Sequence, residues 1–363
     1  MTTQSENRVV RVGLIGAGAN TRLKHIPGFQ SQGDVEIVAV ANRSLSSSQK
    51  VADEYDIPRA YGHWAELIED DDIDAICIGT WPYMHAPATL AALDADLHVL
   101  VEARMAMNSL EAHMMLEAAG STDRVTQIVP APHTLPVDQT IIGLISEGFI
   151  GDLVAVRIQV ANGSSFPDYD APIHWRHDRD LSGNNIMTMG IWYEALMRWV
   201  GTATEVCAMG QAIVRGRRNL DGRVQTISIP DHLDVMMKMA SGGQANMSVT
   251  TVSGLVPGPS FTVALHGTEG TLTLAETDFT DPGAPQLELK GGRRGETELQ
   301  TIEIMEEKRG EWRVEEEFIN AVRGVEEVTH TSFTDGVKYM EFTDAVSRSM
   351  RAKESVLLPL EHN

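Results

Sequence analysis

Residues 9–21 read VVRVGLIGAGANT, a short apolar run followed at once by a glycine-rich turn. The apolar part is typical of a buried strand in a parallel sheet. A second apolar run, residues 35–41, follows after a stretch long enough for a helix, so the segment predicts a β-α-β unit. In such a unit Gly16 permits the tight turn and Gly18 lets the backbone approach a pyrophosphate at the helix N-terminus. The context favours dinucleotide binding over an ordinary turn.

Composition restricts the class of protein. The 363 residues suffice for two domains with sizeable cores, and no apolar run approaches the length that crosses a membrane. Residues 1–8 lack the hydrophobic segment of a signal peptide, and Cys77 and Cys207 cannot form a disulfide framework, so a cytoplasmic location is expected. The net charge of −22 argues against nucleic acid or membrane partners, and the twelve histidines show no metal-ligand spacing. We expect a small-molecule substrate and no metal.

Short apolar runs alternate with helical stretches over the first third of the chain. The predicted strands are residues 9–15, 35–41, 75–78, 97–101 and 125–129, and the predicted helices are 46–55, 86–93 and 110–119. Asn108 and Ser109 are candidate N-caps for the last helix. The alternation predicts a doubly wound parallel sheet, a Rossmann domain over residues 8–130. Pro130, Pro132 and Pro136 interrupt the pattern and indicate a boundary.

The pattern changes in residues 131–363, where we predict an α+β domain with a mainly antiparallel sheet and helices on one face. Alternating runs predict strands at 153–160, 206–212, 232–239, 244–252, 261–266 and 271–274. Glycines at 242–243 and in 267–270 suggest hairpins. Residues 188–199, 312–322 and 334–351 are predicted helices, whereas residues 281–296 are predicted to be an exposed loop.

The end of the second predicted strand bears on the choice of cofactor. NAD-binding domains usually place a carboxylate there for the ribose 2′-hydroxyl, but this chain has Asn42, Arg43 and Ser44. Arg43 can pair with a 2′-phosphate and Ser44 can donate a hydrogen bond to it, which favours NADP over NAD. The alternative is an exposed arginine at a helix start, with Asn42 serving the ribose of NAD.

Several stretches together resemble the Gfo/Idh/MocA family of nicotinamide-dependent, mostly sugar-acting oxidoreductases. They are residues 12–27 with His25-Ile26-Pro27, the segment TWPYMH at 80–85, VLVE at 99–102, Trp175-Arg176 before Leu181-Ser182-Gly183, HGTEGTL at 266–272, and Asp335-Gly336 with Leu358-Pro359. The resemblance implies a Rossmann domain with an open-faced antiparallel sheet, and dimers or tetramers formed through that sheet. Together with the glycine turn it assigns cofactor binding to Gly16, Gly18, Ala19, Asn20, Thr21, Asn42, Arg43, Ser44, Thr80, Trp81, His85 and Glu102.

The chain departs from the family pattern at its catalytic positions. The Glu-Lys-Pro signature reads Glu102-Ala103-Arg104, so the lysine position holds alanine. The helix motif Asp-x-Gly-x-His-x-x-Asp reads Thr188, Gly190, Trp192 and Ala195 at its fixed positions, so the acid/base histidine is replaced by a tryptophan. Proton transfer must then use another group.

The candidates for that transfer are His177, His133 and Tyr193. Arg104, His174, Trp175, Arg176, Thr188 and Trp192 are candidate substrate-binding residues. Each has a structural alternative: the histidines can cap a turn or lie on a surface loop, Tyr193 can fill the core, and the tryptophans can be packing residues. Glu194 can pair with Arg198 four residues on.

Three functions remain open from the sequence. The favoured one is an NADP-dependent oxidoreductase acting on a sugar-like or other hydroxyl or carbonyl compound, with a non-standard acid/base set. The second is a lyase or glycoside-cleaving enzyme that recycles a bound cofactor without net redox change. The third is a noncatalytic cofactor-binding protein. The replacement of the family's ionisable residues by Ala103, Thr188 and Trp192 supports this alternative.

Overall fold

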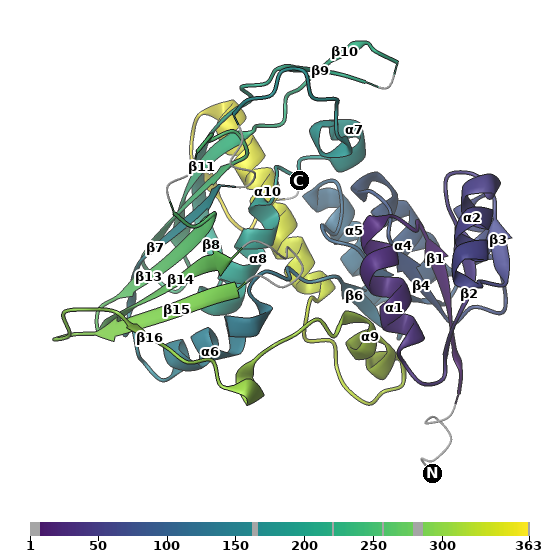
Figure 1. Cartoon of the computed structure of the whole chain (residues 1–363), viewed down its shortest axis with the longest axis horizontal. Helices are drawn as coiled ribbons and strands as arrows, with labels where there is room; N and C mark the ends of the chain where they lie inside the picture. Colours follow the sequence, from purple (N-terminus) through teal and green to yellow (C-terminus); the bar gives the residue numbers. More distant parts are fainter. Residues whose placement is uncertain (1–7, 162–165, 220, 256–257, 279–285, 362–363) are drawn as a thin grey trace. The chain divides into compact units, whose positions relative to one another are not determined.

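The computed structural model describes residues 8–161, 166–219, 221–255, 258–278 and 286–361. The chain forms two compact units, coloured along the sequence in Figure 1. The first comprises Met1–Pro130, Asp180–Gly183 and Arg313–Met340, and the second comprises Ala131–Arg179, Asn184–Trp312 and Glu341–Asn363. One boundary between the units follows Pro130, whereas segments 180–183 and 313–340, which the sequence analysis placed in the second domain, belong to the first unit.

The first unit is built on a parallel sheet, as the strand-helix alternation predicted. Its described strands run in the order β3-β2-β1-β4-β5-β6, and each neighbouring pair is parallel. The strands are β1 (Val10–Ile15), β2 (Val35–Ala41), β3 (Arg59–Tyr61), β4 (Ala75–Ile78), β5 (His98–Val101) and β6 (Thr126–Ile128). Sequence patterning missed only the edge strand β3, which is three residues long and half-buried throughout. The strand order reverses between β1 and β4, where such folds bind ligands beyond the strand ends.

Helices connect these strands, and of the two N-cap candidates for the last helix, Asn108 is the cap whereas Ser109 is the first helical residue. They are α2 (Leu45–Tyr55), α3 (Trp64–Ile68), η2 (Pro82–Met84), α4 (His85–Asp94) and α5 (Ser109–Gly120). Asn108 Oδ1 accepts the Glu111 N–H at 3.0 Å, which confirms Asn108 as the N-cap of α5. Between β1 and β2 the chain forms a π-helix, η1 (Thr21–His25), that continues into α1 (Ile26–Gln30). Single π-turns of this kind are frequent at functional sites.

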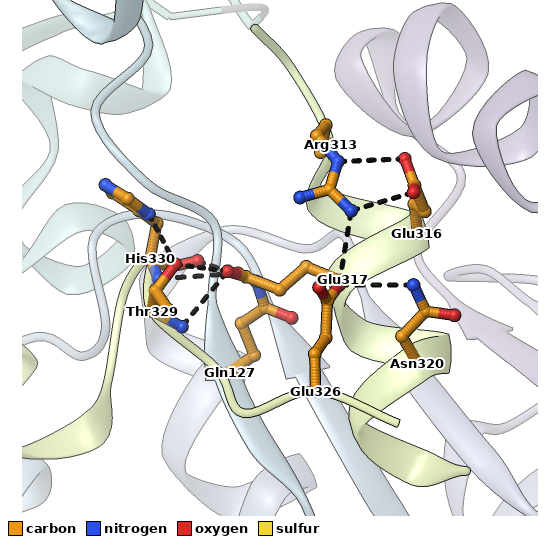
Figure 2. Close-up of polar contacts among 8 residues, drawn as sticks. All are labelled: Gln127, Arg313, Glu316, Glu317, Asn320, Glu326, Thr329 and His330. Carbon is orange, nitrogen blue, oxygen red and sulfur yellow. Dashed lines mark hydrogen bonds and ion pairs between the residues drawn. The ribbon is translucent and has the colours of Figure 1, made fainter. Parts of the chain in front are cut away.

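The segment 313–340 folds onto the first unit because its helix α9 (Val314–Val322) contributes to that core. The rings of Phe318 and Phe29 pack edge to face at 6.5 Å. The buried Glu317 carboxylate accepts hydrogen bonds from the Gln127 side chain at 2.7 Å and from the Thr329 and His330 backbone N–H groups (Figure 2). A buried carboxylate is stable only with such partners. These contacts join segments about 190 residues apart, which local sequence patterns do not reveal.

The second unit contains a larger, mostly antiparallel sheet. Its described strands run in the order β16-β15-β14-β13-β7-β12-β11-β8-β17, with β7 and β12 the parallel pair. They are β7 (Leu153–Ala161), β8 (Ala203–Gln211), β11 (His232–Met239), β12 (Gln244–Thr250), β13 (Phe261–Gly267), β14 (Gly270–Asp278), β15 (Gln286–Arg293), β16 (Gln300–Thr301) and β17 (Val356–Leu357). The antiparallel pairs β11–β12 and β13–β14 are the hairpins predicted at the glycine connectors. A separate ribbon pairs β9 (Gly216–Arg218) with β10 (Val224–Thr226).

The predicted loop over 281–296 is wrong for residues 286–293, while 294–296 lie outside any strand. Residues 286–293 form β15, which pairs along β14, while 279–285 lie outside the described residues. The loop was predicted because the segment is polar and rich in turn-forming residues. In the structure, a Cβ at Gly291 would lie 2.6 Å from the Ile302 side chain and 2.9 Å from the Phe149 ring, so this glycine permits close packing instead.

Helices α6 (Leu135–Ser146) and α8 (Met189–Val200) pack on one face of this sheet. Ile141 of α6 and Trp199 of α8 lie among the inward side chains of β13, β14 and β15. Helix α8 ends at Gly201, whose φ of 84° favours glycine. The remaining described helices are η3 (Trp175–His177), α7 (Arg179–Ser182), η4 (Glu306–Lys308) and α10 (Phe333–Ala352). No described helix combines the length and apolar character needed to cross a bilayer.

Candidate functional site

The glycine turn after β1 is fixed by its own packing. Gly16 has a φ of 86°, and a Cβ there would lie 2.6 Å from the Thr80 side chain. Thr21 is buried, and its hydroxyl donates to the Gly16 carbonyl at 3.0 Å. Thr21, at the third small position of the motif, therefore closes the turn with a hydrogen bond. Gly79, at the end of β4, leaves no room for a side chain because a Cβ would meet the Thr21 hydroxyl at 2.0 Å.

Gly18 differs from Gly16 because the protein itself does not require glycine there. A Cβ at Gly18 would meet only the Gly79 carbonyl, at an ordinary 3.6 Å, and Gly18, Ala19 and Asn20 are all exposed. Nearby, the Thr80 hydroxyl oxygen is buried and has no hydrogen-bond partner in the described part of the chain. An open backbone beside an unsatisfied hydroxyl fits the pyrophosphate of a dinucleotide.

The three residues after β2, Asn42, Arg43 and Ser44, have different roles. Asn42 Oδ1 accepts the Ala17 N–H at 2.8 Å, and its amide donates to the Ser47 carbonyl at 3.1 Å, so this side chain braces the glycine turn. Ser44 is the N-cap of α2, with its hydroxyl accepting the Ser47 N–H. Arg43 is exposed, and its guanidinium lies 5.4 Å from the centre of the Trp81 ring.

The strand end after β5 carries a buried charged cluster. Glu102 Oε1 lies 3.0 Å from His25 Nε2 and also accepts the Asn20 side-chain amide, while Oε2 accepts the Ala103 N–H at 3.1 Å. On its other side, His25 Nδ1 lies 2.5 Å from Glu315 Oε1. Despite burial, which lowers it, the hydrogen bonds and charges of the two carboxylates raise the pKa of His25 to about 9.

His85 joins the loops that follow β4 and β5. Its Nδ1 lies 2.9 Å from the Arg104 carbonyl and its Nε2 lies 3.0 Å from the Thr80 carbonyl. Complete burial lowers the pKa of His85. Arg104, a predicted substrate-binding residue, is itself only 4% exposed. His85 therefore positions the loops and Arg104 is largely enclosed by them.

In the second unit, His133 and Trp192 lie together. His133, in the turn after residue 130, is half-buried, and burial lowers its pKa. The His133 ring stacks on the Trp192 ring. Trp192 also contacts Phe261, with the two ring centroids 4.4 Å apart. The turn is held in place by α8, because Glu194 accepts the Ala131 N–H at 3.1 Å.

Two neighbouring side chains of α8, Tyr193 and Glu194, are buried and contact other parts of the protein. Tyr193, predicted as a catalytic candidate, is 1% exposed, its ring stacks on Phe342 at 3.6 Å and its hydroxyl accepts the Ala203 N–H. Burial raises the pKa of Tyr193 to about 12, so this phenol lies in the core and is a poor base. Glu194 pairs with Arg198 at 2.9 Å, the interaction that their spacing suggested. Thr188 lies at the N-cap position of α8.

The predicted substrate loop forms a short turn of its own. His174 Nδ1 accepts the Arg176 N–H at 3.3 Å, and His177 Nδ1 accepts the His174 N–H at 3.2 Å. Burial and the charge of Arg217 lower the pKa of His177 to about 4. The Arg176 guanidinium lies 4.2 Å from the centre of the Trp175 ring. Both imidazoles are therefore neutral at neutral pH and cap the turn through Nδ1.

The predicted residues thus fall into separate groups. The cofactor set gathers at the carboxyl ends of β1, β2, β4 and β5 within the first unit. In the second unit, His133 and Trp192 form one group and residues 174–177 another. Sequence reasoning missed Glu315, which lies 290 residues from its partner His25 and gives no local signal. Across the described ranges, His, Cys, Asp and Glu side chains form no cluster suited to a metal ion.

Comparison with known protein families agrees with this geometry. Residues 10–129 match the model of an oxidoreductase family with an NAD-binding Rossmann fold, GFO_IDH_MocA, and residues 139–273 match the GFO/IDH/MocA C-terminal domain. The chain belongs to the Gfo/Idh/MocA family. As a member of this family it is an NAD(P)-dependent oxidoreductase.

Curated relatives and solved structures align with most of this chain. Trans-1,2-dihydrobenzene-1,2-diol dehydrogenase of Bos taurus is 26% identical over 273 residues, covering 74% of this chain and 73% of that protein. The Danio rerio protein of the same name is 28% identical, covering 73% and 72%. The structure of levoglucosan dehydrogenase with NADH and L-sorbose aligns with a TM-score of 0.83 at 19% identity, covering 96% of this chain and 99% of that one. At that identity the structural likeness shows the fold alone.

Proposed function

We propose that this chain is an NADP-dependent dehydrogenase of a sugar-like or other hydroxyl- or carbonyl-bearing small molecule, with an acid/base group that differs from the family's lysine and histidine. The observation that carries the proposal is the open backbone at Gly18 beside the buried Thr80 hydroxyl, which has no hydrogen-bond partner among the described residues. The named relatives support the substrate class, since a dihydrodiol and levoglucosan both present ring hydroxyls to their enzymes.

The choice of NADP rests on the end of β2. Arg43 is exposed, and no carboxylate stands at positions 42–44 to repel a 2′-phosphate. Asn42 is occupied by the Ala17 and Ser47 backbone, which leaves Arg43 as the side chain of this group suited to bind a phosphate bidentately. The Trp81 ring beside Arg43 restricts where its guanidinium can lie.

His133 is our candidate for the proton-accepting group. A base needs an unprotonated nitrogen, but Nδ1 of His177 already accepts a backbone N–H, so its other nitrogen carries the proton and can only donate. Tyr193 is excluded by its burial and raised pKa. His133 is neutral at neutral pH because burial lowers its pKa, and in the described residues its ring nitrogens make no hydrogen bond. When bound, the nicotinamide would accept the hydride, and His133 would accept the hydroxyl proton.

The test combines cofactor identification with a substrate screen. Nucleotides released from the purified protein would be identified by mass spectrometry, and a panel of polyols, sugars and cyclic diols would be incubated with NADP⁺ or NAD⁺. We expect one substrate class to reduce NADP⁺ stoichiometrically with carbonyl formation. Product formation without net nucleotide reduction would instead establish the lyase or glycoside-cleaving alternative. No nucleotide binding at all would contradict the proposal.

We further propose a homodimer or homotetramer assembled through the second sheet. Along β11, inward residues such as Val235 are fully buried, whereas the alternate face exposes Asp234, Met236 and Lys238. Met209 on the neighbouring β8 is 80% exposed and lies opposite Asp234 in the register. Light scattering on the purified protein tests the assembly, and Met236→Lys is expected to shift it toward the monomer.

A further inference from the structure

His25 lies between two carboxylates in the interior of the first unit. The side chain is 0% exposed, with Glu315 Oε1 2.5 Å from Nδ1 and Glu102 Oε1 3.0 Å from Nε2. A neutral imidazole carries one N–H, so it can donate to one carboxylate while its lone pair faces the other. Both contacts are favourable only when both nitrogens are protonated. The geometry therefore points to an imidazolium between two carboxylates.

The chain is shaped to admit Glu315 at this position. A Cβ at Gly28 would lie 2.5 Å from the Glu315 carboxylate oxygen, so any larger residue would displace that side chain. Gly28 and His25 are three residues apart on consecutive helical turns, which places them on one side of the segment. Glu315 itself comes from the first turn of α9.

Glu102 connects this buried bridge to the cofactor-binding turn. Its Oε1 accepts hydrogen bonds from His25 Nε2 and from the Asn20 side-chain amide, and its Oε2 accepts one from the Ala103 N–H. The hydrogen bond and charge of His25 lower the pKa of Glu102 against the opposing effect of burial. An ionised, immobilised carboxylate thus ties the turn after β1 to the end of β5.

We propose that His25 is a positioning residue for dinucleotide binding: held as a cation by Glu315, it fixes Glu102 and, through it, Asn20 in the arrangement that the dinucleotide requires. This role shares one assumption with the proposed function, namely that the dinucleotide binds at the glycine turn after β1. Other ionisable groups that interact with the two glutamates are Cys77 on β4, a buried thiol whose pKa is raised, and His85 on α4, whose pKa is lowered by burial. Both are uncharged at neutral pH.

The first experiment reads the charge of His25 without any activity. In ¹⁵N-histidine-labelled full-length protein, the resonance absent from His25→Gln is followed by NMR from pH 5 to 10. We expect imidazolium shifts at pH 7.5 and a midpoint near pH 9. A midpoint near the ordinary value of about 6.5 would overturn the bridge.

The second experiment measures NADP⁺ and NAD⁺ binding by calorimetry. We expect His25→Gln to weaken binding at least tenfold, whereas the matched control His98→Gln, at the opposite end of β5, stays within twofold of the unaltered chain. Binding by the unaltered chain should weaken as pH rises through about 9, because the cation is lost there. In Glu315→Gln this midpoint should move to lower pH, since one stabilising charge is gone.

These readouts separate a positioning role from a merely structural one. Circular dichroism establishes that each variant is folded, and a shifted pH midpoint in Glu315→Gln would not arise from general destabilisation. Unchanged affinity in folded His25→Gln, or an unmoved midpoint in Glu315→Gln, would overturn the positioning role alone. Absence of dinucleotide binding by the unaltered chain would overturn both this role and the proposed function, and the NMR titration would still decide the charge of His25.

Discussion

His133 stacks on Trp192, with the ring centroids 5.5 Å apart and the planes inclined by 12°. Trp192 occupies the helix position where the family resemblance expects an acid/base histidine. An imidazole is nevertheless present beside that position, supplied by the turn after residue 130 instead of by α8. The same unit thus retains a histidine next to the altered helix position.

This relationship makes His133 the first residue to substitute. We expect His133→Gln to lower kcat by roughly 10²–10⁴-fold, because a general base contributes about that much, while NADP⁺ affinity stays unchanged. Because its pKa is lowered, His133 should be neutral above pH 6.5, and oxidation should slow only as pH falls below that value. His177→Gln is the matched control and should retain most of the turnover. Full turnover in His133→Gln, measured in steady state, would place the base elsewhere.

The two glycines of the turn should respond differently to alanine. Gly16→Ala is expected to lower thermal stability, since it combines a positive φ with a contact 2.6 Å from Thr80. Gly18→Ala should leave the melting temperature unchanged but weaken NADP⁺ binding about tenfold or more, because the new methyl group would lie where the phosphate approaches. Calorimetry and thermal melts of both variants decide this. Undiminished binding by Gly18→Ala would remove the main support for the dinucleotide site.

Arg43 should determine the preference between the two dinucleotides. We expect Arg43→Ala to weaken NADP⁺ binding about tenfold through loss of a charge-assisted contact to the 2′-phosphate, with NAD⁺ affinity little changed. Arg22→Ala is a suitable control, because Arg22 lies near the same turn but pairs with Glu54. Equal losses for NADP⁺ and NAD⁺ would mean that Arg43 does not read the 2′ position.

Arg198 should be a large contributor to the stability of the second unit. Its guanidinium pairs with Glu194 at 2.9 Å and Asp138 at 2.8 Å, and these carboxylates are almost fully buried. Arg198→Met would leave both charges uncompensated, and we expect a loss of about 3–5 kcal/mol in the free energy of unfolding. Denaturant titration measures the loss. The exposed Arg309→Met, a matched control, should change stability by less than about 1 kcal/mol.

Acid should destabilise the fold partly through His98. Burial and Arg124 lower its pKa to about 4, and its Nδ1 accepts the Val125 N–H at 2.9 Å. Because its pKa is lowered, neutral His98 contributes fully to the free energy of unfolding above pH 6.5, and this contribution is lost as the pH falls toward 4. We expect His98→Gln to flatten the decline in melting temperature between these values. An equally steep decline in the variant would assign the acid sensitivity to other groups.

Local sequence patterns were sufficient for most elements of the fold. Strand β2 and strand β11 have the predicted bounds, because the apolar run of β2 and the strict alternation of β11 are visible in the sequence. Asn108 was recognisable as a cap for the same local reason. Strand β15 was missed because its segment is polar and rich in turn-forming residues, and its pairing with β14 is visible only in the fold.

The candidate site could be predicted only in part from local sequence patterns. The glycine turn was predicted because its residues are consecutive, and Arg43 because strand ends of this fold occur at known intervals. The sequence suggested Tyr193 and His177 by residue type. Only their surroundings show that one hydroxyl and one ring nitrogen are already hydrogen-bonded to backbone groups.

The sequence by itself therefore determined the family and the two kinds of sheet, because each depends on motifs and alternation patterns made of residues close together in the chain. The tertiary structure alone decided the position of His25 between two carboxylates, the burial of Tyr193 and the stacking of His133 on Trp192. Those properties depend on partners that are distant in the sequence and are brought together by folding, such as Glu315, which lies 290 residues from His25. Burial and hydrogen bonding set the protonation of a side chain, and neither is encoded at the residue itself.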